Sequence, residues 1–286
     1  MYMDMFATGC HNVKGPPSTH GELVTSQRIS LNLNQDRPLV GVVLKMPCPA
    51  VVEMAGHCNA DLVIIDTEHG AGSDTELEHH VRAADSAGIP VLVRVPANET
   101  PYIQAALDAG AVGVVVPHVS SVADAQRATT TAHYPPFGHR GLALTTRAGG
   151  QGTAQLEAAL ADARQNTIVI CQIEDMPGVE AVDDILGVDG VSGIWIGSND
   201  LSMSMRDPAG HLDSAAAEAA VAVVSEAVAG SPKVLAMLAP PPAAMSSWRA
   251  RGADILLITG HDLMAKSLTA YIGTAASIDD GQPSAM

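Results

Sequence analysis

Short apolar segments alternate with longer segments of helical periodicity between Pro38 and about residue 275. The apolar segments are rich in β-branched residues, which is typical of parallel strands buried on both faces. The pattern predicts eight strands, at Leu39–Leu44, Asp61–Asp66, Pro90–Val95, Val112–Val116, Ile168–Ile173, Gly193–Ile196, Lys233–Met237 and Ile255–Ile258.

The segments between these strands have helical spacing, and several end at a glycine that can serve as a C-cap. The predicted helices are Ala50–Gly56, Thr75–Ala87, Pro101–Ala109, Val122–Ala132, Leu156–Arg164, Val179–Leu186, Ala215–Ala229, Ala243–Arg251 and His261–Tyr271. Eight β then α units in about 235 residues match a single (β/α)₈ TIM barrel, whereas a doubly wound sheet would normally need fewer units.

The barrel is expected to occupy residues 38–275. Residues 1–37 carry no sustained period and read as an N-terminal extension, partly disordered or serving as an oligomer arm, and residues 276–286 read as a C-terminal tail. No Gly-x-Gly-x-x-Gly sequence follows the first strand and no P-loop pattern occurs, which disfavours a nucleotide-binding domain.

Charge and cysteine content narrow the class further. Acidic residues outnumber basic ones 31 to 15, and no lysine- or arginine-rich segment occurs, so binding to nucleic acid or to an anionic membrane is not expected. The four cysteines form no Cys-x-x-Cys pair, and neither a signal sequence nor a long apolar span is visible. We therefore expect a cytoplasmic protein that acts on a small molecule.

Polar residues gather where the predicted strands end. In a (β/α)₈ barrel these positions share one face and surround one cavity. The residues concerned are Asp66, Glu68 and His69 after the second strand, Arg94 at the third, Pro117 and His118 after the fourth, Gln172 and Glu174 at the fifth, and Gly197, Ser198, Asn199 and Asp200 after the sixth. The other histidines, His57, His79, His80, His133, His211 and His261, lack ligand spacing and are interpreted as surface or capping residues.

Glu174 and Asp200 form a candidate pair of metal ligands, because Mg²⁺ and Mn²⁺ prefer carboxylate oxygens. Mg²⁺ is the first expectation, and Mn²⁺, Co²⁺ and Zn²⁺ remain open. The alternative is purely structural: Glu174 would begin a turn before Pro177, and Asp200 would cap a helical turn starting at Leu201.

His69 is a candidate base that Asp66 could orient, and Arg94 could hold a substrate carboxylate or a developing enolate through forked hydrogen bonds. The backbone N–H groups of Gly197 and Ser198 could bind an anion. The structural alternatives are a loop histidine, a helix-capping aspartate, an arginine in an ion pair and an ordinary strand-to-helix turn.

These residues occur within motifs that resemble the HpcH/HpaI family of class II, metal-dependent pyruvate aldolases, over about residues 28 to 272. The motifs, in family order, are Asp66-Thr67-Glu68-His69, Val93-Arg94-Val95-Pro96, Val116-Pro117-His118-Val119, Tyr134-Pro135-Pro136 with Arg140-Gly141, Gln172-Ile173-Glu174 and Ile196-Gly197-Ser198-Asn199-Asp200-Leu201-Ser202.

The resemblance implies a phosphoenolpyruvate/pyruvate-type (β/α)₈ barrel with a divalent metal on Glu174 and Asp200 and with Gln172 beside it. It further implies that Arg94 contacts the keto or enolate oxygen and that His69, steered by Asp66, assists proton transfer. Asp108 would reach the site of a neighbouring subunit. Members of the family commonly exchange the last helix and form hexamers built from dimers.

The leading functional hypothesis is therefore (retro-)aldol cleavage of a 4-hydroxy-2-oxo acid to pyruvate and an aldehyde. Two departures from the usual family pattern affect the substrate: Gly197-Ser198-Asn199-Asp200 replaces Gly-Pro-Ala-Asp, and the loop over residues 138–150 differs. The alternative is a decarboxylating relative that uses oxaloacetate, either citrate-synthase-like or macrophomate-synthase-like, with His139, Arg140 and Arg147 holding additional carboxylates. A non-catalytic barrel that binds a small acid is the third hypothesis.

Overall fold

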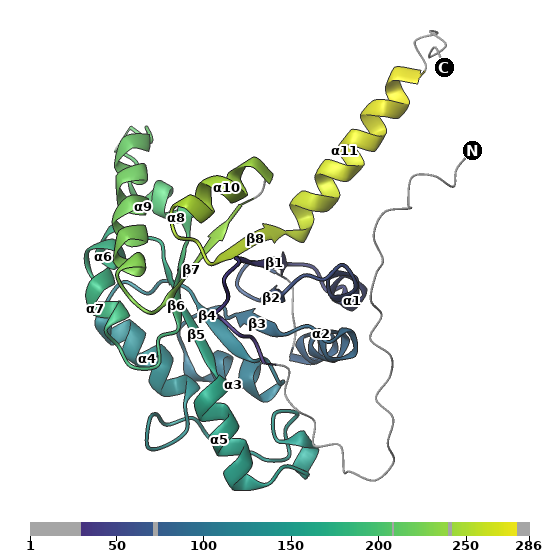
Figure 1. Ribbon diagram of the computed structural model, residues 1–286, viewed down its shortest axis with the longest axis vertical. Coiled ribbons are helices and arrows are strands. Elements are labelled where there is room, and N and C mark those ends of the chain that lie inside the picture. The colour runs from purple at the N-terminus through teal and green to yellow at the C-terminus, as the bar shows by residue number, and fades with distance from the viewer. Residues whose placement is uncertain (1–29, 71–73, 208, 240–241, 279–286) are drawn as a thin grey trace.

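The eight predicted strands form a closed, all-parallel barrel in the computed structural model, which describes residues 30–70, 74–207, 209–239 and 242–278 (Figure 1). Each strand pairs with the next along the chain, and the eighth pairs with the first. The strands are β1 (Leu39–Leu44), β2 (Leu62–Asp66), β3 (Val91–Arg94), β4 (Gly113–Val116), β5 (Ile168–Ile173), β6 (Gly193–Ile196), β7 (Val234–Leu238) and β8 (Ile255–Thr259). The prediction of a (β/α)₈ barrel is confirmed.

Helices surround the barrel (Figure 1). They are α1 (Pro49–His57), α2 (Asp74–Ala87), α3 (Thr100–Asp108), α4 (Val122–Ala132), α5 (Leu156–Asn166), α6 (Met176–Glu180), α7 (Val182–Leu186), α8 (Ser198–Ser204), α9 (Ser214–Ala229), α10 (Pro242–Ala250) and α11 (Gly260–Ile278), with a 3₁₀ turn, η1, at Gly150–Gly152. The single helix predicted at Val179–Leu186 is instead two short helices. The first starts earlier because the Asp175 carboxylate accepts the Gly178 N–H, and the two meet at Ala181, whose backbone leaves the helical region.

The core has two layers that follow from the alternation of side chains along each strand. One layer fills the barrel interior, with residues such as Leu62, Ile64, Leu92 and Ile170. The other lies between the strands and the helices. Gly113 lies so close to β5 that a Cβ atom there would overlap the Ile168 carbonyl oxygen, so the β4–β5 contact requires glycine.

Residues 30–37, the described part of the predicted N-terminal extension, lie at the amino ends of the strands. Leu31 and Leu33 pack against the interior layer of the barrel. Arg37 donates two hydrogen bonds to Asp61, of 2.8 and 2.5 Å, and Asp61 also accepts the Val40 N–H at 2.8 Å. This segment is thus attached to the barrel by both apolar contacts and an ion pair.

The last described helix, α11, extends away from the barrel (Figure 1) and is longer than the predicted helix. It contacts β1 and β8. Large apolar side chains are exposed along it, namely Leu263, Met264, Leu268, Tyr271 and Ile272. None of the described helices combines the length and apolar content needed to cross a bilayer.

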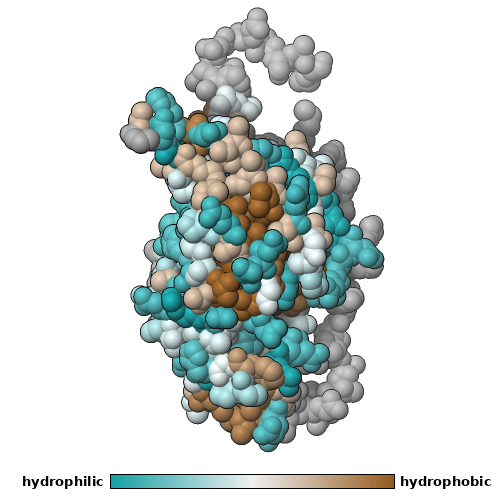
Figure 2. Space-filling model, turned by 90° about the vertical axis from the view of Figure 1, so that its left-hand side faces the viewer, coloured by the Kyte–Doolittle hydropathy of each residue, from teal (hydrophilic) through white to brown (hydrophobic). Residues whose placement is uncertain are grey.

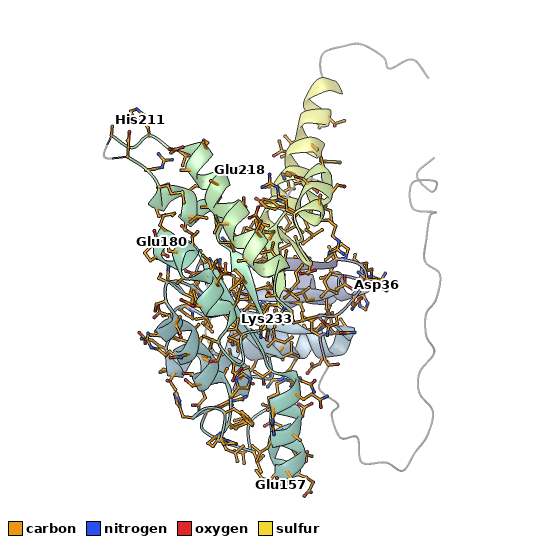
Figure 3. All side chains as sticks on the ribbon, turned by 60° about the vertical axis from the view of Figure 1, so that its left-hand side comes forward. Asp36, Glu157, Glu180, His211, Glu218 and Lys233 are labelled. Atoms are coloured by element: carbon orange, nitrogen blue, oxygen red, sulfur yellow. The ribbon has the colours of Figure 1, made fainter. Side chains whose placement is uncertain are left out.

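Elsewhere the surface is mixed. The face seen in Figure 2 carries apolar areas that are interrupted and bordered by hydrophilic residues. Figure 3 shows the labelled side chains of Glu157, Glu180, His211 and Glu218 at separate places on the outside of the molecule, all of them exposed. The three glutamates among them belong to three different helices, α5, α6 and α9.

Candidate active site

The polar residues predicted at the strand ends continue the inward-facing rows of the barrel interior. Leu62 and Ile64 precede Asp66 on one face of β2, Leu92 precedes Arg94 on β3, and Ile168 and Ile170 precede Gln172 and Glu174 in the β5 row. All four polar side chains are buried, and all four belong to one connected set of contacts. The structure therefore brings together Asp66, Arg94, Gln172 and Glu174 as the sequence predicted.

Asp66 and Arg94 form a buried pair with two hydrogen bonds. Arg94 Nε donates to Asp66 Oδ1 at 3.0 Å, and an Nη donates to Oδ2 at 2.5 Å. Burial acts to raise the pKa of Asp66, but the hydrogen bonds and charge of Arg94, together with the His69 backbone N–H and the charge of Lys45, hold the pKa below its ordinary value. The alternative interpretation of Arg94 as an ion-pair residue is thus partly correct, because its Nε and one Nη bind Asp66.

The backbone of His69, and not its side chain, is held by Asp66. Asp66 Oδ1 accepts the backbone N–H groups of Glu68 and His69, at 3.1 and 3.2 Å, so Asp66 fixes the path of the chain after β2. The His69 side chain is 52% exposed, and its Nε2 lies 3.9 Å from Glu68 Oε2. Asp66 therefore positions His69 through the main chain; the structure records no contact between the carboxylate and the ring within the described residues.

The other half of the Arg94 fork faces the strand ends. Its second Nη donates to Gln172 Oε1 at 3.3 Å and lies 3.1 Å from Glu68 Oε2. The guanidinium also lies over the Trp195 ring, 5.2 Å from its centre, which fixes its plane from below in the interior layer. Arg94 therefore presents a pre-oriented donor edge to the barrel mouth.

Glu174 is the most constrained carboxylate of the set. Its Oε1 accepts the His118 backbone N–H at 2.7 Å and lies 2.7 Å from His118 Nδ1, while its Oε2 accepts a hydrogen bond from Gln172 Nε2. A Cβ atom at Gly197 would lie 2.8 Å from both Glu174 Cβ and Oε2. Glycine is therefore needed here to let the start of α8 approach Glu174.

Asp200 lies in the first turn of α8, three residues after Gly197. It is exposed, and within the described residues its carboxylate makes no hydrogen bond or ion pair. Gly197 is the N-cap of α8 and Ser198 its first residue, so the predicted strand-to-helix turn is present. Asp200 is thus uncommitted and close in sequence to the residue that touches Glu174.

Glu68 and His118 lie at predicted strand ends, but the sequence alone indicates no role for them. In the structure both contact the strand-end residues, Glu68 through Arg94 and His118 through Glu174. Burial raises the pKa of Glu68, and the nearby Glu174 acts in the same direction, against Arg94, His69 and His118. His118 Nε2 lies 3.3 Å from Glu68 Oε1. One ligand atom from each of Glu68, His118 and Glu174 lies within 4.8 Å of the others, which is compatible with a bound cation.

Asp108 and the arginines of the 138–150 loop belong to a different part of the molecule. Asp108, at the end of α3, accepts a hydrogen bond of 2.7 Å from the buried Arg140, which also lies over the Tyr134 ring. Arg147 pairs with Asp85. These residues hold the loop against the helices, and neither arginine contacts the strand-end cluster in the described structure.

The interpretation of His80 as a surface or capping residue was wrong. His80 is buried on α2, donates from Nδ1 to the Glu76 carbonyl oxygen at 2.6 Å and accepts the Cys48 N–H at Nε2. It links α2 to the loop after β1, a tertiary role that helical spacing could not show. A cavity of about 610 Å³ lies between residues 133–137 and α5, but it includes no member of the strand-end cluster.

The fold and the cluster define a class of protein: a (β/α)₈ barrel with a carboxylate- and arginine-lined site at the carboxyl ends of its strands. Residues 40–265 match the HpcH/HpaI aldolase/citrate lyase family, and the chain belongs to this family. The resemblance seen in the sequence motifs is thereby confirmed.

Individual relatives refine this placement. A 5-keto-4-deoxy-D-glucarate aldolase of Salmonella arizonae is 34% identical over 176 residues, which are 62% of this chain and 66% of the relative. The match therefore spans just under two thirds of that relative.

Two solved structures cover more of the chain. An HpcH/HpaI family protein from Burkholderia cenocepacia superimposes with a TM-score of 0.78 at 28% identity, covering 87% of this chain and 98% of its own. The citrate synthase SbnG gives a TM-score of 0.78 at 30% identity, covering 88% and 100%.

Proposed function

We propose that the protein is a metal-dependent carbon–carbon lyase that acts through a pyruvate enolate, most simply by (retro-)aldol cleavage of a 4-hydroxy-2-oxo acid to pyruvate and an aldehyde. The observation that carries the proposal is the buried arrangement in which Arg94, fixed by Asp66 and Trp195, directs its remaining donors toward Gln172 and the Glu68 carboxylate. An enolate oxygen is the kind of developing charge that such a pre-oriented donor stabilises.

The residues fit a divalent cation. Glu174 and Asp200 are the proposed ligands: the first is buried and held in place by its neighbours, and the second is uncommitted. A metal bound there would supply Lewis-acid stabilisation of the negative charge that develops on the 2-oxo acid. Carboxylate ligands suit Mg²⁺ first, and Mn²⁺, Co²⁺ or Zn²⁺ are also compatible with the site.

The remaining roles are assigned from position. Arg94 binds the keto or enolate oxygen, and Gln172 orients the bound acid beside Glu174. Asp66 keeps Arg94 and the main chain at His69 in place, and the exposed His69 imidazole carries the proton to and from the substrate. Gly197 and Ser198 present backbone N–H groups of the first turn of α8 to the substrate carboxylate.

A homo-oligomer, in the form of a hexamer built from dimers, is part of the proposal. The apolar residues exposed along α11 are consistent with a helix that packs on a second copy of the chain. In such an assembly Asp108 would reach a neighbouring site after exchanging part of its contact with Arg140. Light scattering coupled to size exclusion tests the assembly, and a monomer at micromolar concentration would contradict it.

The alternative activity is release of carbon dioxide from oxaloacetate, with or without capture of the enolate by an acceptor. It is supported by the similarity to a citrate synthase over almost the whole length of the chain. The pairing of Arg140 with Asp108 and of Arg147 with Asp85 counts against these two arginines as carboxylate-binding groups within one chain.

One experiment separates these activities. Pyruvate release would be measured from 4-hydroxy-2-oxoheptanedioate and from oxaloacetate, with and without chelator, on the wild type and on Arg94→Ala. Turnover of the first compound that needs both metal and Arg94 supports the aldolase, and turnover of oxaloacetate alone supports the alternative. Turnover insensitive to both changes would contradict the assigned site, and no turnover of either compound would favour a non-catalytic acid-binding barrel.

A further inference from the structure

Lys45 continues the inward-facing row of β1. Leu39 and Val43 of this strand fill the barrel interior, and Lys45, directly after the end of the strand, is the next residue in the same row. The register of β1 with β2 and of β2 with β3 places Lys45 beside Asp66, and Asp66 beside Arg94. Two cations with one carboxylate between them therefore lie on three neighbouring strands, above the apolar interior.

The ammonium group of Lys45 is not needed to neutralise Asp66. Lys45 Nζ lies 3.9 Å from Asp66 Oδ2, beyond hydrogen-bonding distance, and donates no hydrogen bond to any residue that the structure describes. Asp66 already accepts two hydrogen bonds from Arg94 and two from backbone N–H groups. Burial raises and Arg94 lowers the pKa of Asp66, and Lys45 contributes least to that lowering. The positive charge of Lys45 is thus in excess of what Asp66 requires.

The main chain at Lys45 is held from two sides. The loop after β2 packs closely on it, because a Cβ atom at Gly70 would lie 2.8 Å from the Lys45 carbonyl oxygen and 3.1 Å from its Cα. On the other side the buried His80 accepts the Cys48 N–H and so ties the following residues to α2. The Lys45 side chain itself is 33% exposed. The stem therefore starts from a fixed position, and the ammonium group is accessible to a ligand.

Lys45 and Glu174 lie on opposite sides of the barrel mouth. Lys45 follows β1 and Glu174 follows β5, and these strands are opposite each other in the closed order of eight, with Arg94 on β3 between them. A 2-oxo acid held at its oxo end by Arg94, on the Glu174 side, has its other end free to extend toward β1. The ammonium group of Lys45 is then placed to meet a negative charge at that other end.

The loop over residues 138–150 offers no such cation within one chain. Arg140 and Arg147, which the sequence suggested for additional carboxylates, are each bound to an aspartate of a helix. Lys45 belongs to none of the family motifs present in the sequence. A preference based on Lys45 would therefore be a property of this chain and not of the family motifs.

We propose that Lys45 binds the second carboxylate of a dicarboxylic 2-oxo acid, at the end remote from the oxo group that Arg94 contacts. The inference rests on the proposed function and adds to it the class of substrate. Cleavage would release pyruvate and an aldehyde that carries the second carboxylate. Hydrogen bonds between an ammonium and a carboxylate group are charge-assisted and are among the stronger ones in proteins.

A matched pair of substrates tests the inference. The first is 4-hydroxy-2-oxoheptanedioate, and the second is 4-hydroxy-2-oxoheptanoate, in which a methyl group replaces the second carboxylate. Pyruvate release would be measured with added metal on the wild type and on Lys45→Met, which keeps an unbranched stem and removes the charge. We expect kcat/KM for the dicarboxylate to fall by about 10- to 100-fold in Lys45→Met, mainly through KM, while kcat/KM for the monocarboxylate changes little.

Calorimetric binding gives a readout that does not require turnover. The probes are 2-oxoheptanedioate and 2-oxoheptanoate, which lack the 4-hydroxyl group and so cannot undergo retro-aldol cleavage. The ratio of the two affinities should fall in Lys45→Met by the same factor as the kinetic ratio, and Lys45→Arg should retain most of it. The control is Lys233→Met, which removes the same charge at the amino end of β7, where Lys233 Nζ donates to the Val191 carbonyl oxygen.

The outcomes separate the inference from the proposed function. The inference is supported if the wild type prefers the dicarboxylates and only Lys45→Met loses the preference. It is overturned if the wild type binds both acids equally, if the preference survives in Lys45→Met, or if that variant weakens both acids equally, as a purely structural effect through Asp66 would. In these three cases cleavage of either hydroxy acid leaves the proposed function standing.

If the wild type cleaves neither hydroxy acid, the proposed aldol cleavage fails, and the calorimetric ratio still decides on Lys45. A wild type that binds neither 2-oxo acid would overturn both. Circular dichroism shows whether Lys45→Met is folded, and Lys45→Gln, which also removes the charge, replaces it if it is not.

Discussion

Each end of the barrel carries an arginine that binds an aspartate through two hydrogen bonds, but the two pairs differ in their surroundings. At the amino ends of the strands, Arg37 is 59% exposed and Asp61 uses its remaining capacity to accept the Val40 N–H. At the carboxyl ends, the Arg94 side chain is 7% exposed and Asp66 is fully buried. The same chemical pair is thus solvated at one end and removed from water at the other.

The difference shows at which end of the barrel the polar groups can take up a ligand. The Arg37–Asp61 pair satisfies itself and ties residues 30–37 to β2. At the other end Arg94 also contacts Gln172 and Glu68, and Glu68 Oε2, 3.1 Å from Arg94 Nη1, accepts no hydrogen bond within the part of the chain that the structure describes. Buried polar groups are normally satisfied, so an incomplete buried set is a place where a ligand is expected.

The largest effect is expected from Glu174→Gln. The substitution keeps the shape of the side chain but removes the charge that a metal needs, so pyruvate release should fall by about a thousandfold or more. Mn²⁺ affinity, measured by calorimetry, should fall with it, while the far-ultraviolet circular dichroism stays unchanged. A variant that keeps a tenth of the wild-type activity would exclude Glu174 as a metal ligand.

Arg94→Ala should have the next largest effect and should act on stability as well as activity. It leaves the buried Asp66 carboxylate with only Lys45 Nζ, 3.9 Å away, as a cationic partner among the described residues, and breaking a buried pair costs about 3–5 kcal/mol. Urea unfolding measures the loss. Because Asp66→Asn removes the orphaned charge, the double variant should lose less than the sum of the two single variants. Strictly additive losses would mean that the pair does not act as a unit.

The lowered pKa of Asp66 predicts a pH dependence of smaller size. A carboxyl group whose folded-state pKa lies below its unfolded value contributes stability that is present above the unfolded value, about 3.9, and is lost as the pH falls through the folded value. The free energy of unfolding, measured by urea from about pH 6 to about pH 3, should therefore fall less steeply in Asp66→Asn than in the wild type. Equal slopes would show that Asp66 does not titrate with folding. Glu68 acts in the opposite direction, since burial raises its pKa.

Arg37→Ala should have the smallest effect of the four. Exposed ion pairs contribute little, so both the urea midpoint and pyruvate release should remain close to those of the wild type. A loss comparable with that of Arg94→Ala would show that the two ends of the barrel are not as different as their exposure indicates. Arg82→Ala, which removes another exposed pair on α2, is a matched control.

Much of the fold follows directly from the sequence, because buried parallel strands are apolar runs of recognisable length. The position of Asp66, Arg94, Gln172 and Glu174 at the ends of these strands predicts that they share one face of the barrel, and the structure shows that they continue its inward-facing rows. The cluster of Glu68 with His118 could not be predicted this way. It depends on a left-handed backbone at His118 and on the path of the loop after β2, and neither has a periodic signal.

Contacts between residues that are distant in sequence also could not be predicted from the sequence. His80 is interpreted from sequence as a surface or capping residue because it lacks ligand spacing, but its partner is the Cys48 N–H on another loop. Arg140 looked available for a substrate until the structure paired it with Asp108. The sequence shows which charged and polar side chains are available. Their partners in the folded structure determine which of these side chains can still bind a substrate.

Leu31 and Leu33 have a practical consequence for protein production. These two side chains cover the lower layer of the barrel interior, which would otherwise meet water at the amino ends of the strands. A recombinant chain shortened to begin at Pro38 would retain every strand and every residue of the candidate site, yet it would expose apolar surface and should be prone to aggregation. A shortened chain intended for crystallisation should therefore begin no later than Ser30.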